Sequence, residues 1–186
     1  MAEPLVERTP ISMTVAAVKQ LRPKQWFKNI FLFPALLFSG RFLEAGPVVA
    51  ALTGFAAFSM LASSGYILND YLDREADRKH PKKRFRPIAS GALPIPAAWL
   101  LFACAIGSGV ALSMSLSPAF LFIGLVYLTT TLSYSFYFKH RVILDVLFLA
   151  SGFLWRTIAG AIAIQVEVSP WLFLCTAFVA LFFGFN

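Results

Sequence analysis

The chain contains six stretches that are long and apolar enough, or nearly so, to cross a lipid bilayer. A membrane-spanning helix needs about 20 mostly apolar residues. The stretches cover residues 26–43, 47–68, 94–114, 118–138, 142–166 and 169–186. We see no soluble domain between them. The sequence therefore predicts an all-α, polytopic transmembrane bundle that forms a single domain over residues 1–186.

The composition excludes several other classes of protein. The chain is 59% apolar and 13% charged, whereas soluble domains are about 45–50% apolar and about 25% charged. A soluble enzyme, a disordered chain and a disulfide scaffold are therefore excluded. Cys104 and Cys175 lie in apolar runs, and we expect buried thiols without a disulfide. The net charge of +7 indicates topology and anionic ligands here, with no nucleic acid as a partner.

The placement of the basic residues predicts the orientation of the chain. All 16 Lys and Arg residues except Arg41 and Arg156 fall on one side of the predicted membrane. Because cytoplasmic segments are enriched in Lys and Arg, residues 1–25 and the loop 69–93 are predicted to be cytoplasmic. The protein is then a multi-pass protein of the inner (cell) membrane. The last span ends at Asn186 without a polar tail, so we expect the domain to be C-terminally incomplete.

A row of polar residues directly follows the second span. If the helix continues there, Asn69, Asp70, Asp73 and Asp77 lie within about one third of its circumference. Such closely spaced acids destabilise one another unless a cation lies among them. Mg²⁺ suits this pattern, since it binds one or two carboxylates together with substrate phosphates. The alternative is a solvated helix whose i,i+4 ion pairs stabilise it by about 0.2–0.5 kcal/mol each. The continuity of the row with Tyr66, inside the span, favours a functional role.

Basic residues in three other places are candidates for binding phosphate. Arg156 lies near the middle of a span, where it costs about 2.5–3.5 kcal/mol and needs a partner or an anionic ligand. The loop after the acidic row is strongly basic, and Lys28 opens the first span. Each has a plainer explanation. Arg156 could be a structural arginine paired to another helix. The basic loop could set the topology and attract anionic lipid, and Lys28 could snorkel to the interface. The polar face of the fourth span at Tyr127 and Tyr134 either lines the same cavity or joins helices.

Three segments carry a resemblance to a known family. The run NDYLDREADRKHPKKRFRPIASG resembles the first Asp-rich motif and following loop of the UbiA superfamily of intramembrane prenyltransferases. The segments LRPKQWFKN and YSFYFKHRVILDVLFLASGFLWRTIAGA are similar to one branch of it, the decaprenyl-phosphate phosphoribosyltransferases. The resemblance covers about residues 18–186. It implies a nine-span helical bundle, of which six spans are present here, with a central cavity open to the cytoplasm and to lipid.

The resemblance also implies an activity and a set of site residues. The reaction is transfer of 5-phosphoribose from phosphoribosyl diphosphate to a polyprenyl (decaprenyl) phosphate, with Mg²⁺, in making arabinose donors for the cell wall. Asn69 and Asp73 would hold the metal, and Asp70, Asp73 and Asp77 would be the catalytic acids. The implied contacts to the donor phosphates are Lys28, Tyr66, Lys82, Lys83, Arg86, Lys139 and Arg156.

Two other functions remain open at this point. An aromatic prenyltransferase of the same superfamily would use the acidic row to bind a prenyl diphosphate. A truncated, non-catalytic membrane protein would not need those acids at all. The sequence also leaves open whether the chain forms a homo-oligomer.

Overall fold

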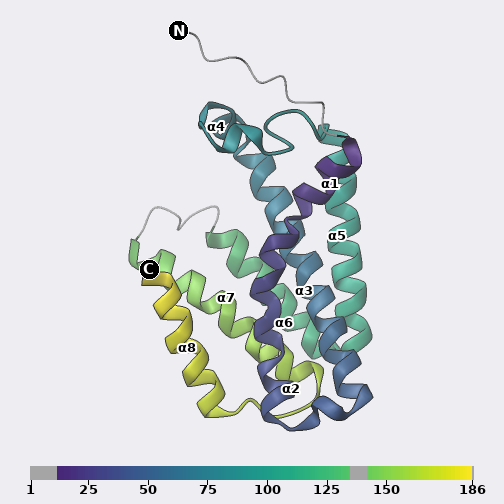
Figure 1. The fold of residues 1–186 in the computed structure, drawn as a ribbon, viewed down its shortest axis with the longest axis vertical. Helices are drawn as coiled ribbons and strands as arrows, with labels where there is room; N and C mark the ends of the chain where they lie inside the picture. The colour runs from purple at the N-terminus through teal and green to yellow at the C-terminus, as the bar shows by residue number, and fades with distance from the viewer. Residues whose placement is uncertain (1–11, 135–141, 186) are drawn as a thin grey trace.

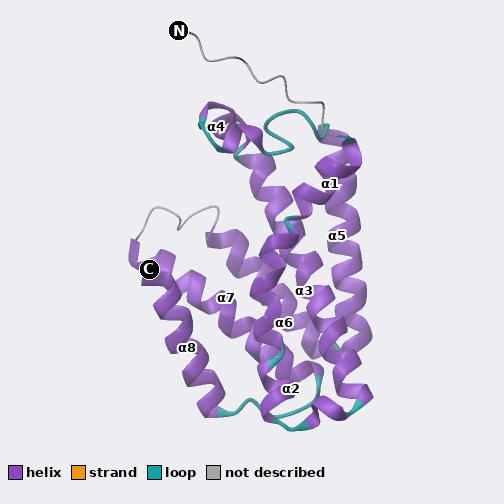
Figure 2. Ribbon diagram, viewed as in Figure 1, coloured by secondary structure: helices purple, strands orange, loops and turns teal. Residues whose placement is uncertain are grey.

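A computed structural model describes residues 12–134 and 142–185, with side chains from residue 146 onward in the second range. All regular structure in these ranges is helical (Figure 2). The α-helices are α1 (Met13–Leu21), α2 (Pro34–Phe38), α3 (Ala45–Leu72), α4 (Arg74–Lys79), α5 (Ile95–Leu116), α6 (Pro118–Ser133), α7 (Val142–Ala163) and α8 (Pro170–Phe185). The 3-10 helices are η1 (Pro23–Leu32), η2 (Arg41–Leu43) and η3 (Lys83–Phe85).

The helices form a bundle around α3, as the sequence predicts. α3 packs against α5, η1, α6 and α7, and α7 also packs against α8 (Figure 1). Three helical segments of the described chain are long and apolar enough to cross a membrane: Ala45–Leu72, Ile95–Leu116 and Val146–Ala163. α6 and α8 are shorter apolar helices. α1, α4 and the basic loop lie at one end of the bundle, and α2 lies at the other (Figure 1).

The expectation of one continuous helix over residues 26–43 is wrong. This segment is built from η1, α2 and η2. Pro34 has no amide hydrogen to donate and interrupts the run after Leu32. A 3-10 helix rises about 2.0 Å per residue, so η1 extends further per residue than an α-helix. The segment therefore still runs along the bundle beside α3 to reach α2 at the far end (Figure 1).

The helix carrying the acidic row is also not continuous. α3 ends at Leu72, Asp73 has backbone angles of φ −84° and ψ 1°, and α4 begins at Arg74. α4 turns aside from the axis of α3 at the upper end of the bundle (Figure 1). The four polar residues consequently do not lie on one helical face, and the row divides at Asp73.

Small residues and aromatic rings fix how the helices meet. A Cβ atom on Gly160 of α7 would lie 2.0 Å from the Leu32 carbonyl oxygen, so only glycine allows η1 to cross α7 this closely. In the core, the Phe58 ring lies 5.6 Å from Phe120 and 5.2 Å from Tyr127, so α3 orients Tyr127. Cys104 and Cys175 are free, as expected, but both are exposed rather than buried because they lie on outward faces of α5 and α8.

Candidate functional site

A cavity of about 260 Å³ lies between η1, α3, α6 and α7. We call it the inner cavity. It brings together four of the predicted site residues, Lys28, Tyr66, Asn69 and Arg156. Its other lining residues are Arg22, Gly65, Tyr127, Thr131, Tyr134, Phe148, Leu149, Gly152 and Phe153. The polar residues at the end of the fourth predicted span therefore do line the same cavity.

Arg156 is held in the inner cavity by neutral groups. Its side chain is 4% exposed. Nε donates to Asn29 Oδ1 at 2.7 Å, Nη1 to the Gly152 carbonyl oxygen at 2.7 Å and Nη2 to the Tyr127 hydroxyl at 2.9 Å. The guanidinium group also lies 4.6 Å from the centre of the Tyr127 ring. These contacts orient the guanidinium but do not neutralise its charge.

Asn29 was not singled out by the sequence, yet it positions Arg156. It is fully buried on η1, and its Nδ2 donates to Ser59 Oγ at 2.9 Å. This bond fixes the amide so that Oδ1 faces Arg156. Ser63 of α3 holds both η1 and the end of α1: Trp26 Nε1 donates to Ser63 Oγ at 3.0 Å, and Ser63 Oγ donates to the Leu21 carbonyl at 2.7 Å. Only the placement of η1 beside α3 and α7 reveals these roles.

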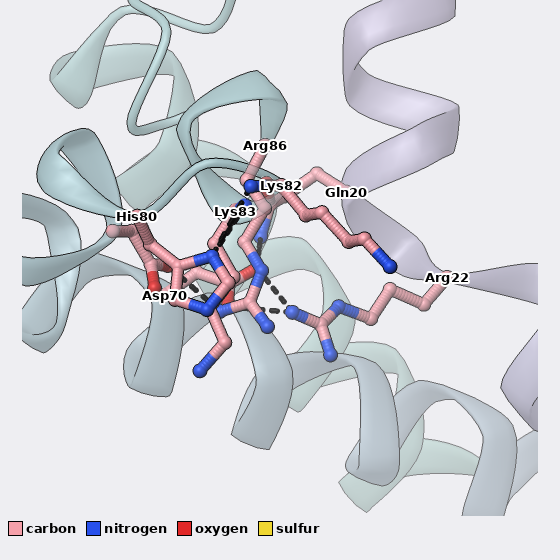
Figure 3. Close-up of polar contacts among 8 residues, drawn as sticks. Gln20, Arg22, Asp70, His80, Lys82, Lys83 and Arg86 are labelled. Carbon is pink, nitrogen blue, oxygen red and sulfur yellow. Dashed lines mark hydrogen bonds and ion pairs between the residues drawn. The ribbon is translucent and has the colours of Figure 1, made fainter.

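Asp70 lies at the centre of an ion cluster at the end of α3 (Figure 3). Its carboxylate is 1% exposed and accepts hydrogen bonds from Arg22 Nη2 at 2.6 Å and 2.8 Å. Arg86 Nη1 donates to Asp70 Oδ1 at 2.9 Å and to Asp77 Oδ2 at 2.7 Å. Gln20 Nε2 donates to Asp70 Oδ2 at 2.9 Å. The cluster joins α1, the end of α3, α4 and the basic loop.

The other predicted residues lie apart from the inner cavity. Lys82 and Lys83 are exposed, and their backbone N–H groups each donate to His80 Nδ1 at 3.2 Å (Figure 3). Asp73 lies in the turn between α3 and α4 and is partly buried. Lys139 lies outside the described residues.

The inner cavity is cationic. Three basic residues reach it: Arg22 from the N-cap of η1, Lys28 from η1 and Arg156 from α7. No acid is among its lining residues in the described parts of the chain. The charge of Arg22 is balanced by Asp70. Lys28 and Arg156 form no ion pair with another described residue. Because unbalanced cations in a partly desolvated cavity attract anions strongly, this arrangement suits a phosphorylated ligand.

The acidic residues do not form a complete magnesium site by themselves. No group of three or more His, Cys, Asp or Glu residues within 12–134 and 146–185 could hold a metal ion. Asp70 and Asp77 are bound by arginines, and Asn69 lines the inner cavity. Mg²⁺ often takes one or two protein ligands and completes its shell with water and substrate phosphates. Asn69 is therefore the predicted ligand that could meet an ion on a diphosphate in the inner cavity, while Asp73 does not line that cavity.

Comparisons with known proteins agree with the fold. The model of the UbiA prenyltransferase family matches residues 30–185. The chain is 37% identical over 189 residues to the decaprenyl-phosphate phosphoribosyltransferase of Mycobacterium tuberculosis, covering 98% of this chain and 62% of that protein. It is 38% identical over 177 residues to the enzyme of the same name from Mycolicibacterium smegmatis, covering 93% and 56%.

A solved structure shares the fold. A UbiA homolog from Archaeoglobus fulgidus, bound to DMAPP and Mg²⁺, superimposes with a TM-score of 0.72 at 21% identity, covering 90% of this chain and 61% of that one. The chain spans less than two thirds of the length of each of these relatives.

Proposed function

Because this chain belongs to the UbiA prenyltransferase family, we propose that it transfers 5-phosphoribose from phosphoribosyl diphosphate to a polyprenyl phosphate such as decaprenyl phosphate. The names of the two curated relatives support this donor and acceptor. The product would be a lipid-linked precursor of arabinose donors for the cell wall. The reaction would take place at the inner membrane, with residues 1–25 and the loop 69–93 in the cytoplasm, where the soluble donor is available.

The observation that carries the proposal is the positive charge of the inner cavity, which no acid of the described residues balances at Lys28 or Arg156. Arg156 makes all three of its described hydrogen bonds to neutral oxygens, and Lys28 lines the same cavity. A diphosphate would supply the missing negative charge. Tyr66, Tyr127 and Asn69 offer polar groups beside it. A purely structural arginine would keep the same neutral partners without binding an anion, so donor binding by Arg156 variants separates the two roles.

The chemistry needs positioning and charge stabilisation more than it needs a protein nucleophile. The bond between the ribose anomeric carbon and the diphosphate oxygen breaks, and positive charge develops on that carbon. A phosphate oxygen of the lipid, which is already anionic, forms the new bond, and diphosphate leaves. Arg156 and Lys28 would hold the departing diphosphate and stabilise its growing charge. The acceptor needs no strong general base.

The acidic residues would take two different roles. Asn69 and Asp73 would bind the Mg²⁺ of the donor, and the ion would neutralise charge on the leaving group. The Archaeoglobus fulgidus homolog, which is bound to DMAPP and Mg²⁺, supports such a metal. Asp70 and Asp77 would hold Arg22 and Arg86 in place, as they do in the ion cluster.

The test uses membranes from cells that express the complete reading frame. Phosphoribosyl diphosphate labelled in the ribose is incubated with decaprenyl phosphate and Mg²⁺, and the organic extract is counted. We expect label in the lipid fraction, and loss of that signal when EDTA removes the metal. A parallel incubation supplies a prenyl diphosphate and an aromatic acid. Alkylation of the aromatic acid without any labelled lipid would support the aromatic prenyltransferase instead, and no product in either incubation would contradict catalysis of both kinds.

A further inference from the structure

A second cavity, of about 510 Å³, shares the lining residue Arg22 with the inner cavity. We call it the outer cavity. Arg22 lines both cavities, while Lys28 and Arg156 line only the inner one. The remaining residues around the outer cavity are Val18, Lys19, Pro23, Lys24, Gln25, Asp70, Arg86 and Pro87. They come from α1, the start of η1, the end of α3 and the basic loop.

The shape of the outer cavity depends on the turn at Arg22. Arg22 has a positive φ of 54° and ends α1, and Pro23 then begins η1. This left-handed turn is strained for a residue other than glycine, so the surrounding contacts must hold it. Lys19 lies in the last turn of α1 and Lys24 in the first turn of η1. The two lysines therefore flank Arg22 on either side of the turn.

Asp70 fixes the two arginines of the outer cavity without balancing its lysines. The carboxylate is 1% exposed, and Arg22 and Arg86 bind it from two directions (Figure 3). About a quarter of each arginine side chain stays exposed, with values of 25% and 26%. The Arg22 guanidinium also lies 4.9 Å from the centre of the Tyr66 ring. Asp70 also lines the outer cavity, but the arginine side chains present far more accessible surface to a ligand there than the carboxylate does.

The lysines of the outer cavity have no acidic partner among residues 12–134 and 146–185. Lys19 and Lys24 are exposed, and neither forms an ion pair with another residue that the structure describes. Arg22 and Arg86 are already paired with Asp70 and Asp77, so the net positive charge of this concave site comes from the two lysines, which no described acid balances. The arginines add fixed hydrogen-bond donors for an anion. A surface that served only to set membrane topology would need the charges but not the cavity or the arginines that Asp70 fixes.

We propose that the outer cavity is a binding site for a phosphate monoester, formed by Lys19, Lys24, Arg22 and Arg86. Arg22 lines both this site and the inner cavity. Two phosphate groups could then bind near the same arginine: a diphosphate in the inner cavity and a monoester in the outer cavity.

The monoester has two possible sources, and both follow from the proposed function. It is the 5-phosphate of the sugar donor or the phosphate of the lipid acceptor. The first source would explain how the protein distinguishes a phosphoribosyl donor from a prenyl diphosphate, which has no second phosphate group. The site itself stands on the geometry and does not depend on the transfer reaction.

The test measures binding and does not require turnover. The complete chain is placed in nanodiscs of zwitterionic lipid, and the probes are ribose 5-phosphate, ribose, and decaprenyl phosphate added to the discs. The test variant is Lys19→Gln/Lys24→Gln. The control variant, Lys79→Gln/Arg84→Gln, removes two exposed charges that line neither cavity. Both variants change exposed side chains only, so we expect both to fold.

We expect the test variant to bind one of the two monoesters about tenfold more weakly, a change of about 1.4 kcal/mol. The control should bind as the wild type does, and ribose should not bind. Weaker binding of ribose 5-phosphate identifies the donor, whereas weaker binding of decaprenyl phosphate identifies the acceptor. The proposal is overturned if the wild type binds neither monoester. It is also overturned if the test variant binds as the wild type does, or if both variants lose affinity equally. A failure to transfer phosphoribose with the binding difference intact would reject the proposed function alone.

Discussion

At the scale of single residues, the structure gives the members of the polar row different surroundings. Asn69 faces the inner cavity, while Asp70 and Asp77 are almost completely buried and bound to arginines. The spacing of the row correctly indicates that these residues lie near one another. It cannot show that Arg22, 48 residues earlier, reaches Asp70, because that contact depends on how α1 and η1 fold back against α3.

Replacing Asp70 tests whether it fixes the two arginines. Asp70→Asn leaves Arg22 and Arg86 facing a neutral amide, and removing one partner of a buried ion pair typically costs about 3–5 kcal/mol. We expect a lower midpoint of thermal unfolding in detergent. Asp77→Asn is the matched comparison, since Arg86 keeps its bond to Asp70 there, and it should cost less. Equal midpoints for Asp70→Asn and the wild type would show that the cluster does not stabilise the fold.

At the scale of helices, the apolar pattern predicts most elements but not the irregular one. The spans expected from residue 47 onward correspond to α3, α5, α6, α7 and α8, with ends that differ by a few residues. Residues 26–43 also form a largely apolar stretch, although it includes Lys28, Asn29 and Arg41, and they form η1, α2 and η2. Hydropathy reports how much of a segment can lie in lipid, and it does not report its helical pitch. The hydrogen bonds of Trp26 to Ser63 and of Asn29 to Ser59 and Arg156 depend on the 3-10 pitch of η1. The sequence pattern therefore did not identify Asn29 as a site residue.

The crossing of η1 and α7 gives a prediction at this scale. In Gly160→Ala the new Cβ atom would lie 2.0 Å from the Leu32 carbonyl oxygen, so η1 must move away from α7. We expect a loss of stability of about 1–3 kcal/mol, as is typical for overpacking, together with weaker donor binding because Lys28 and Asn29 move with η1. Gly107→Ala is the control, because nothing lies within 4 Å of its new Cβ atom. Identical unfolding of the two variants would contradict this close crossing.

At the scale of the whole molecule, the bundle has one basic end and one end with few charges. α1, α4 and η3 with the basic loop lie at the first end, and η2 lies toward the second, where Arg41 bonds to Glu44 and to the Ile164 carbonyl (Figure 1). The sequence predicts this segregation from the positions of Lys and Arg alone. Both cavities include residues from the basic end, since Arg22 lines each of them. The neutral partners of Arg156 are visible only in the folded chain, because they are 4, 29 and 127 residues away.

The orientation of the bundle is a prediction of its own. A reporter that is active only in the cytoplasm should be active when fused after Gly91, in the basic loop, and inactive when fused after Leu116, at the end of α5. The positive-inside bias is the physical reason. Activity at Leu116 and none at Gly91 would reverse the topology and place both cavities away from the cytoplasmic donor.

The central claim is that unbalanced cations in the inner cavity bind a diphosphate donor. The most direct measurement is titration calorimetry of phosphoribosyl diphosphate into the complete protein in nanodiscs, with and without Mg²⁺. We expect the wild type to bind, more tightly with Mg²⁺, and Arg156→Leu to bind at least about tenfold more weakly. Arg41→Gln, which removes a charge at the other end of the bundle, should bind like the wild type. Undiminished affinity in Arg156→Leu, or no binding by the wild type with or without the metal, would contradict the claim.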